Sequence, residues 1–512
     1  MGNIVNKIKG LDNVSHALRG RKRKHTDSDY ESCDELTDQM DRSLNTPKRK
    51  KLVSTAKYIY QALFKEEHNS DISVAAMGKV WHLHKIYLSQ SPYFASMFSG
   101  SWKETLEDYI DIKIVDTNIN VESLNAVFGS LYMDEVVLEP KEIVSILATA
   151  TLFQLDNLIE QCADVMIETT NPETAVRYYE ASKEYGVKKV KESTFNWLLV
   201  NLLSFYLKNT KWLRLIDTNL MHSLVSSPEL FVMQTEFTLY TLLRYWLFLK
   251  TNPNYIVTDK SSSMTDQVTK FFDRDDNTPF LQTRDGQPYE KVFRVLRIQH
   301  LLNHHVDLKV LQQDNIIPKN WINELLFHSW SNMLKVDQTL ESGPKECDEK
   351  VFLDSCMRCG RTLLEATNQK WRWTGFNFGL DLVLISDTKS LRIKRHHRTE
   401  NERLLSLQLK RNFLIRVQLA SLDDLRQIKH KQSTEIQSIS LEKNAESILM
   451  VFDKKLTYPM LLSVNLMVIN PNTSPANSKG TESTSNDAGI PSTSAEHNSD
   501  DNYFDFYDFS AV

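Results

Sequence analysis

The residues with the most evident capacity for chemistry are Cys356 and Cys359, which form a Cys-x-x-Cys motif. Cysteines at this spacing are common zinc ligands, but a structural zinc site needs four ligands. The nearby candidates for the other ligands are Cys347 and the adjacent His396 and His397. Two interpretations stay open: a zinc site that includes Cys356 and Cys359, or two reduced cysteines in a loop. We favour the second because the other ligand pair would have to come from elsewhere in the chain.

Motifs of the common enzyme classes are absent from the sequence. It contains no GxxxxGK[ST] phosphate loop, no HExxH motif, no GxSxG nucleophile elbow and no GxGxxG dinucleotide loop. His82 and His84 alternate along an expected strand, and His304 and His305 lie in an expected helix, so we interpret them as structural histidines. We therefore expect a non-catalytic protein that has no cofactor.

Composition excludes several classes of protein. The 512 residues suggest about three domains. The 61 Lys and Arg nearly balance the 66 Asp and Glu, so the net charge of −5 does not indicate a nucleic-acid-binding protein. Five cysteines are too few for a disulfide scaffold. The most apolar stretch, Phe237 to Leu249, is too short to span a membrane and contains Arg244, and the first ten residues lack the apolar segment of a secretory signal.

The N-terminal segment, residues 1–53, is expected to be a disordered tail because it alternates blocks of charge without apolar clusters. Two basic clusters flank an acidic run, which favours nuclear import over nucleic-acid binding; a solvated tail without a receptor is the alternative. The cluster residues are Arg21, Lys22, Arg23, Lys24, Lys48, Arg49, Lys50 and Lys51. Thr46 precedes Pro47 as in proline-directed phosphorylation sites. Gly2 is a candidate for myristoylation, although Asn6 stands where Ser or Thr is preferred, and a plain disordered start is the other interpretation.

Hydrophobic periodicity divides the rest of the chain. Residues 54–168 mix short alternating strands with helical runs, and residues 169–250 are helical throughout. Residues 251–350 hold a polar break, Thr251 to Thr278, followed by further helical periodicity at 288–336. From Val351 the period switches to two, so residues 351–471 are expected to form a sandwich-like all-β domain. The aromatic string Trp371, Trp373, Phe376 and Phe378 is expected in its core. Residues 472–512 have the composition of a disordered tail and include the acidic-aromatic segment from Asp500 to Phe509. The fold class is thus α+β, in several domains.

One stretch of the first domain resembles a known family. The string SDISV…WHLHKIYLSQSPYFASMFSGSWKE at residues 70–104 looks like a BTB (POZ) domain, with Asp71 before a strand and His84-Lys85 opening a helix. The resemblance continues at Leu131-Tyr132, followed by an expected strand over 135–138. The helices at about 169–250 are similar to the BACK segment that follows many BTB domains. The strings at 57–64, 231–237 and 371–379 resemble the germ cell-less family of insects and vertebrates, over roughly residues 47–470.

The resemblance implies a partner and a contact site. BTB-BACK proteins act as substrate adaptors of ubiquitin ligases built on the third cullin, and their BTB domains form homodimers. The contact motif of the family is hydrophobic-x-Glu, which Trp102, Lys103 and Glu104 match. An apolar anchor with a carboxylate beside it suits a groove on a partner. Phe98 and Tyr132 are expected as supporting apolar surface. Trp102 capping the BTB core is the alternative interpretation.

The resemblance also implies a place and a purpose. The germ cell-less family is associated with the nucleus and nuclear envelope, where nuclear-envelope proteins are expected partners, and a cytoplasmic or membrane-associated pool is compatible with Gly2. Insect members promote primordial germ cell formation by directing a receptor tyrosine kinase of the terminal pathway to degradation. We expect the C-terminal β domain to capture the protein substrate, because loops on a rigid sandwich make good recognition surfaces. The rival hypothesis is a nuclear-envelope scaffold or transcriptional co-repressor that uses the BTB domain only to dimerise.

Overall fold

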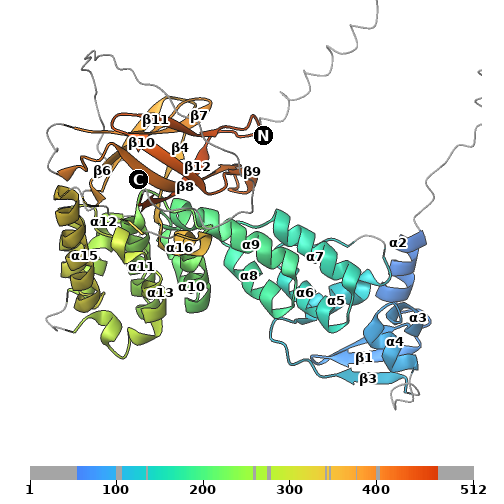
Figure 1. Cartoon of the computed structure of the whole chain (residues 1–512). Helices are drawn as coiled ribbons and strands as arrows, with labels where there is room; N and C mark the ends of the chain where they lie inside the picture. Colours follow the sequence, from blue (N-terminus) through green and yellow to red (C-terminus); the bar gives the residue numbers. More distant parts are fainter. Residues whose placement is uncertain are drawn as a thin grey trace, which may run out of the picture.

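The structure is a computed structural model in which three parts follow one another. It describes residues 55–99, 107–133, 136–257, 261–273, 278–338, 340, 343–344, 347–375, 378–398 and 404–470. Figure 1 shows a small α+β unit at one end, a layer of helices in the middle, and a β unit stacked on the far part of that layer. The α+β fold class, with a helical middle and a C-terminal β unit, is confirmed.

The α+β unit is built on a three-stranded sheet of order β2-β1-β3, in which β1 and β2 are antiparallel and β1 and β3 are parallel. Met77 and Gly78 join β1 to β2 with positive φ angles of 50° and 79°, as a two-residue hairpin turn requires. Residues 136–138, expected to be part of a strand, are not one, because no strand among the described residues pairs with them. The elements are α2 (Thr55–Ile59), η2 (Tyr60–Lys65), β1 (Ile72–Ala76), β2 (Lys79–Leu83), α3 (Lys85–Leu88), α4 (Pro92–Ser99), β3 (Tyr109–Ile112), α5 (Val121–Ser130), α6 (Ile143–Leu152) and α7 (Asp156–Glu168).

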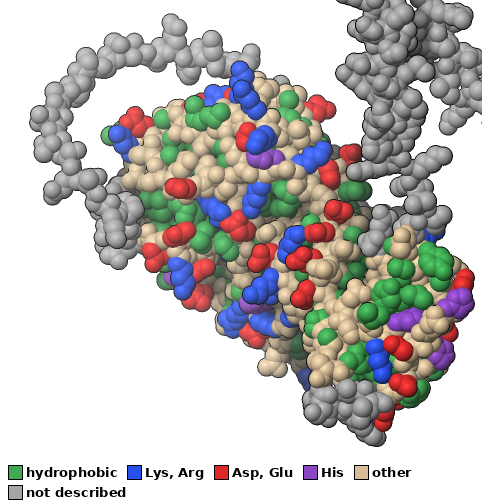
Figure 2. Space-filling view, turned by 90° about the vertical axis from the view of Figure 1, so that its right-hand side faces the viewer, with side chains coloured by type: hydrophobic (Ala, Val, Ile, Leu, Met, Phe, Trp, Pro, Cys, Tyr) green, Lys and Arg blue, Asp and Glu red, His purple; other side chains and the backbone are tan. Residues whose placement is uncertain are grey.

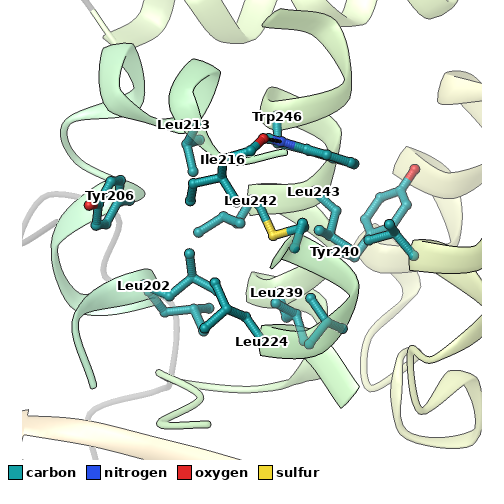
Figure 3. Close-up of a cluster of buried hydrophobic side chains, with 14 of the residues drawn as sticks. Leu202, Tyr206, Leu213, Ile216, Leu224, Leu239, Tyr240, Leu242, Leu243 and Trp246 are labelled. Carbon is teal, nitrogen blue, oxygen red and sulfur yellow. Dashed lines mark hydrogen bonds between the residues drawn. The ribbon is translucent and has the colours of Figure 1, made fainter. Parts of the chain in front are cut away.

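The helical layer packs around α11. Figure 3 shows side chains from the η4 and η5 turns, among them Leu202 and Leu213, facing Leu239 and Leu242 of α11. Trp246 is buried there, and its indole N–H donates to the Ile216 carbonyl at 2.9 Å. In the part of the chain that is described, no helix is long and apolar enough to cross a membrane. The elements are α8 (Ala175–Glu184), α9 (Lys188–Asn201), η4 (Leu202–Tyr206), η5 (Thr210–Leu215), α10 (Thr218–Ser226), α11 (Glu236–Thr251), α12 (Ser261–Phe272), η6 (Phe280–Gln282), η7 (Gln287–Tyr289), α13 (Glu290–Arg294), η8 (Ile298–His300), α14 (His305–Asp314) and α15 (Lys319–Asp337).

The polar break expected at 251–278 contains a helix, α12, which corrects that prediction. Met264, Val268 and Phe272 of α12 lie at a spacing of four and are buried in the same core as α11. A spacing of four places side chains on one helix face. Polar residues between them obscured this pattern in the sequence.

The β unit is a sandwich of two sheets. One is five-stranded, of order β10-β8-β12-β4 with β9 paired to β8, and the other is four-stranded, of order β11-β7-β6-β5. Trp371 and Trp373 lie in the core between the sheets, as expected, together with Phe413 and Leu462. Phe378 is partly buried against this core, and Phe376 lies outside the described residues. The unit begins with a helix at 349–355 rather than a strand, because Asp348 caps it by accepting from the Val351 N–H at 2.7 Å. The elements are α16 (Glu349–Ser355), β4 (Met357–Leu363), β5 (Gln369–Gly375), β6 (Leu380–Ser386), β7 (Ser390–Arg395), β8 (Lys410–Leu422), β9 (Ile428–Ser433), β10 (Gln437–Glu442), β11 (Glu446–Val451) and β12 (Met460–Ile469).

A buried ion pair joins the helical layer to the β unit. Glu236, the first residue of α11, is paired with Arg358 of β4, and both side chains are almost fully buried. Arg358 donates to both carboxylate oxygens, at 2.6 and 3.0 Å, and the Arg297 backbone N–H adds a third donor at 2.9 Å. Burial alone raises the pKa of the Glu236 carboxyl, but Arg358 and Arg297 outweigh it and leave the pKa below its ordinary value. The charge on Glu236 is therefore part of the junction.

A second cluster of polar contacts fixes the same junction nearer the α+β unit. Glu229 accepts hydrogen bonds from Gln418 at 2.7 Å and Lys431 at 2.9 Å, and it pairs with Arg416. Arg426 donates to Asn201 at 2.8 Å, across 225 residues of sequence. With two separated sets of contacts, the β unit is held in one orientation on the helices.

Candidate protein-binding site

One concave surface among the described residues is a groove of about 410 Å³ on the α+β unit. It lies at the start of α4, between the end of α5 and the turn from α6 into α7. Gln154 makes that turn with a φ of 57°, a left-handed conformation that reverses the chain between the two helices. The lining residues include Gln90, Pro92, Leu131, Met133, Gln154, Asn157, Leu158 and Gln161.

The groove has an apolar floor and a polar rim. Leu131 and Leu158 are buried beneath it, while three amides and one carboxylate are exposed around it: Gln154, Asp156, Asn157 and Gln161. Gln90 is held in place because its side-chain amide donates to the Leu131 carbonyl at 2.9 Å. An apolar floor ringed by amides and one carboxylate can seat one apolar side chain of a partner and satisfy the polar groups around it.

Aromatic rings beneath the groove fix its walls. Phe153, at the end of α6, packs on Phe94 of α4 and Phe128 of α5, with ring centroids 5.1 and 5.3 Å apart. The buried Ser91 hydroxyl donates to the Phe153 carbonyl at 2.5 Å and ties the start of α4 to the end of α6. The three helices that border the groove are thus locked to one another.

Comparison with known proteins places these features in a family. Residues 60–170, which include the groove, match the BTB/POZ domain model. The chain is 48% identical over 494 residues to "Protein germ cell-less" of Drosophila melanogaster, which covers 92% of this chain and 86% of that relative. It is 40% identical over 444 residues to "Germ cell-less protein-like 1" of Homo sapiens, with 85% of each chain covered. The chain belongs to the germ cell-less family. A match to "Kelch repeat and BTB domain-containing protein 8" of Xenopus tropicalis, 28% identical, covers only 34% of the chain.

Two supporting residues expected at the partner surface lie in different settings. Phe98 is half-buried on α4 and stacks on Phe94 at 6.1 Å. Tyr132 is buried, with 3% of its area exposed, so its expected place on the contact surface is corrected. Its hydroxyl accepts the His84 backbone N–H at 3.0 Å and its ring stacks on Tyr87, and burial raises its pKa. In this germ cell-less family member Tyr132 positions the BTB core.

Several residues expected to act in binding or targeting lie outside the described residues. These are Gly2, Thr46, the basic clusters at 21–24 and 48–51, and the motif Trp102-Lys103-Glu104. Helix α4 runs about 10 Å from Pro92 at the groove to Ser99. In the sequence, the motif begins three residues after Ser99.

The Cys356 and Cys359 thiols do not converge on one site. Cys359 lies on β4 in the sandwich core, whereas Cys356 lies just before that strand in a separate cluster with Cys347 and Phe352. Burial raises the pKa of Cys359 to about 12, so its thiol is protonated at neutral pH. The Cys356 sulfur instead accepts from Arg297 at 2.9 Å. Among the described residues, no group of three or more His, Cys, Asp or Glu is arranged to hold a metal ion.

Sequence reasoning missed the residues that give the surfaces their shape. The groove depends on Gln90 and Ser91, which lie in the BTB-like string, and on the Gln154 turn, which belongs to no motif. Arg358 lies inside the Cys-x-x-Cys motif. Its role in the ion pair can be recognised only when its partner Glu236, 122 residues away in the sequence, is known. One sequence signal could have separated the two cysteines. Side chains alternate between the two faces of a strand, so Arg358 of β4 and Cys356 just before it are expected on the face opposite Cys359.

Proposed function

We propose that this member of the germ cell-less family is a non-catalytic adaptor that pairs with a second copy through its BTB domain and brings protein substrates to a ubiquitin ligase built on the third cullin. The single observation that carries the proposal is the groove at the start of α4 in a BTB domain. Its apolar floor and polar rim suit a helical segment of a partner that inserts one apolar side chain.

Surface composition of the α+β unit supports self-association. Large apolar side chains are exposed on it, and Figure 2 shows hydrophobic side chains gathered on this unit at the lower right of the view. Apolar surface of this kind marks protein interfaces. The exposed residues include Tyr58, Met77, Val80, Ile86 and Tyr109. They lie on α2, the β1–β2 hairpin, α3 and β3, and none of them lines the groove.

The rigid junction supports the adaptor geometry. In our proposal the β unit captures the substrate, and the contacts of Glu236 and Glu229 hold it at a constant position relative to the BTB domain. A fixed spacing raises the effective concentration of a bound substrate near the ligase. The substrate we propose is a receptor tyrosine kinase of the terminal pathway, in line with the resemblance to insect members.

The cellular role follows from family membership and the N-terminal charges. We propose a role in primordial germ cell formation, at the nucleus and nuclear envelope. The basic clusters at 21–24 and 48–51 support import, and myristoylation of Gly2 would supply a membrane-associated pool. Neutralising both clusters should move the protein to the cytoplasm, and unchanged nuclear staining would contradict import through them.

The decisive experiment is a pull-down of the purified full-length chain with the N-terminal part of the third cullin. Glu104→Lys tests the motif, and Asn157→Arg places a long cation in the groove. The matched control is Glu160→Arg, an exposed position on α7 that does not line the groove. We expect Glu104→Lys and Asn157→Arg each to weaken binding at least about tenfold, and Glu160→Arg to bind as the native chain does.

Molecular mass and binding together decide between the hypotheses. Loss of cullin binding with the dimer mass unchanged would support the adaptor. A well-folded native dimer that fails to bind cullin would refute the adaptor proposal and leave the scaffold or co-repressor role. Equal loss in the Glu160→Arg control would show that the groove is not the contact.

A further inference from the structure

Helix α15 (Lys319–Asp337) carries a second apolar face that no described element covers. Its inner face buries Trp321, Ile322 and Leu325. On the outer face Phe327 and Trp330 are 71% and 61% exposed, and they are flanked by Leu326 and Leu334 at 37% and 47%. Figure 1 shows α15 at the outer edge of the helical layer, with nothing packed on its outward side. We call Leu326, Phe327, Trp330 and Leu334 the α15 stripe.

The size of the stripe indicates what can occupy it. Together its four side chains expose on the order of 400 Å² of mostly apolar surface, as much as the largest patch on a typical monomer. A stable interface between two folded chains needs about 800 Å² from each partner. The stripe is therefore too small for a stable dimer and suits a short segment with a few large apolar side chains.

The chain itself contains such a segment outside the described residues. Residues 503–509, Tyr-Phe-Asp-Phe-Tyr-Asp-Phe, hold five aromatic side chains within seven positions. Only two of the seven positions, Asp505 and Asp508, are charged. The segment therefore carries the large apolar side chains that a short docking peptide needs.

The part of the chain that joins this segment to the described residues is long enough to reach α15. The described chain ends at Asn470, whose N–H donates to the Pro344 carbonyl at 3.2 Å. Pro344 lies seven residues after Asp337, the last residue of α15. Seven extended residues span at most about 24 Å, so Asn470, which is bonded to Pro344, lies near that distance or closer to the end of the helix. The 33 residues from Asn470 to Tyr503 span about 32 Å on average as a flexible chain. The 19-residue helix α15 is about 28 Å long. The average span of the tether is therefore similar to the length of the helix.

We propose that residues 503–509 dock on the α15 stripe of the same chain. The tether gives the segment an effective concentration on the order of a millimolar, so even weak contacts keep the stripe occupied. Lys319 and Lys335 are offset on α15 by Glu324 and Asp337, so the contact is chiefly apolar and depends little on salt. An external partner gains access to the stripe only by displacing this segment.

The test uses site-specific photocrosslinking in the full-length chain. Benzoylphenylalanine replaces Phe506, and mass spectrometry locates the crosslinks; the same group at Thr484, on the same tether, is the control for random contact. We expect crosslinks from position 506 to fall within residues 326–334 about tenfold more often than those from position 484. Phe327→Ser with Trp330→Ser should abolish this enrichment. Ile448→Ser with Val451→Ser removes two comparably exposed apolar side chains from β11 and should leave it unchanged.

Three outcomes would overturn the proposal. Crosslinks from position 506 that are spread evenly, or that survive Phe327→Ser with Trp330→Ser, would show that the segment does not use the stripe. Crosslinks that join two chains would assign the contact to a second copy. Crosslinks concentrated on another surface would leave the stripe to an external partner.

Discussion

Replacing Glu236 with Gln should destabilise the protein strongly, because it leaves two buried guanidinium groups without a counter-ion. The substitution keeps the shape of the side chain but removes its charge, while Arg358 and Arg297 stay buried. Breaking a buried pair by neutralising one partner costs about 3–5 kcal/mol. We expect about 4 kcal/mol here, since Arg358 donates to both carboxylate oxygens and the Arg297 backbone adds a third hydrogen bond.

The assay is urea unfolding followed by circular dichroism, with Glu290→Gln as the control. Glu290 pairs with Arg294 on the exposed face of α13, where a pair is worth about 0–1 kcal/mol. Because Glu236 joins the helical layer to the β unit, we also expect unfolding of Glu236→Gln to separate into two transitions. Glu236→Leu with Arg358→Leu should recover much of the loss. A loss below about 1 kcal/mol for Glu236→Gln, in a single transition, would refute the assignment of this pair as the junction.

Three further measurements test other features. Burial lowers the pKa of His300 to about 4 from about 6.5, so stability present above pH 6.5 should fall by roughly 3 kcal/mol as pH drops to 4, and His300→Gln should flatten that slope in pH-dependent unfolding. Gly360→Ala should cost about 3 kcal/mol in the same assay, because a Cβ there would lie 2.3 Å from the carbonyl oxygens of both Leu462 and Val232; an unchanged midpoint would contradict this close approach. Chelator treatment should leave the thermal midpoint unchanged, because Cys356 and Cys359 lie in separate clusters, and a fall of several degrees would revive the zinc interpretation.

Local periodicity predicted much of the fold. Ile110 and Ile112 alternate with charged residues and form β3, and Phe413 to Leu419 alternate and form part of β8. Helix α12 was missed because its three apolar residues are separated by polar ones. Strand β9 was missed because its pairing with β8, rather than its own polar composition, makes it a strand. Strand β7 carried a usable signal, because Leu391 and Ile393 alternate with Arg392 and Lys394.

The candidate site was less accessible from sequence than the fold. Tyr132 was expected on the surface, but it is buried. Its hydroxyl accepts a hydrogen bond from the backbone of His84, and a contact across 48 residues could not be predicted from the sequence. The groove depends in the same way on contacts between distant residues, such as Ser91 with Phe153. A sequence pattern predicts which face of a helix or strand is apolar. It does not predict which three elements will pack together to form a groove, and this is known only from the structure.

The order of the strands has a consequence for biosynthesis. Strand β12 lies between β8 and β4, so the five-stranded sheet cannot close until Ile469 has left the ribosome. Glu236 is made 233 residues before Ile469, so at translation rates of about 5–20 residues per second α11 waits roughly 12–47 s for β12. During that interval α11 exposes a carboxylate and an apolar surface meant for the sandwich, which is the state that chaperones bind. A premature stop before Ile469 would make that state permanent, so truncated products should be degraded rather than persist as partial adaptors.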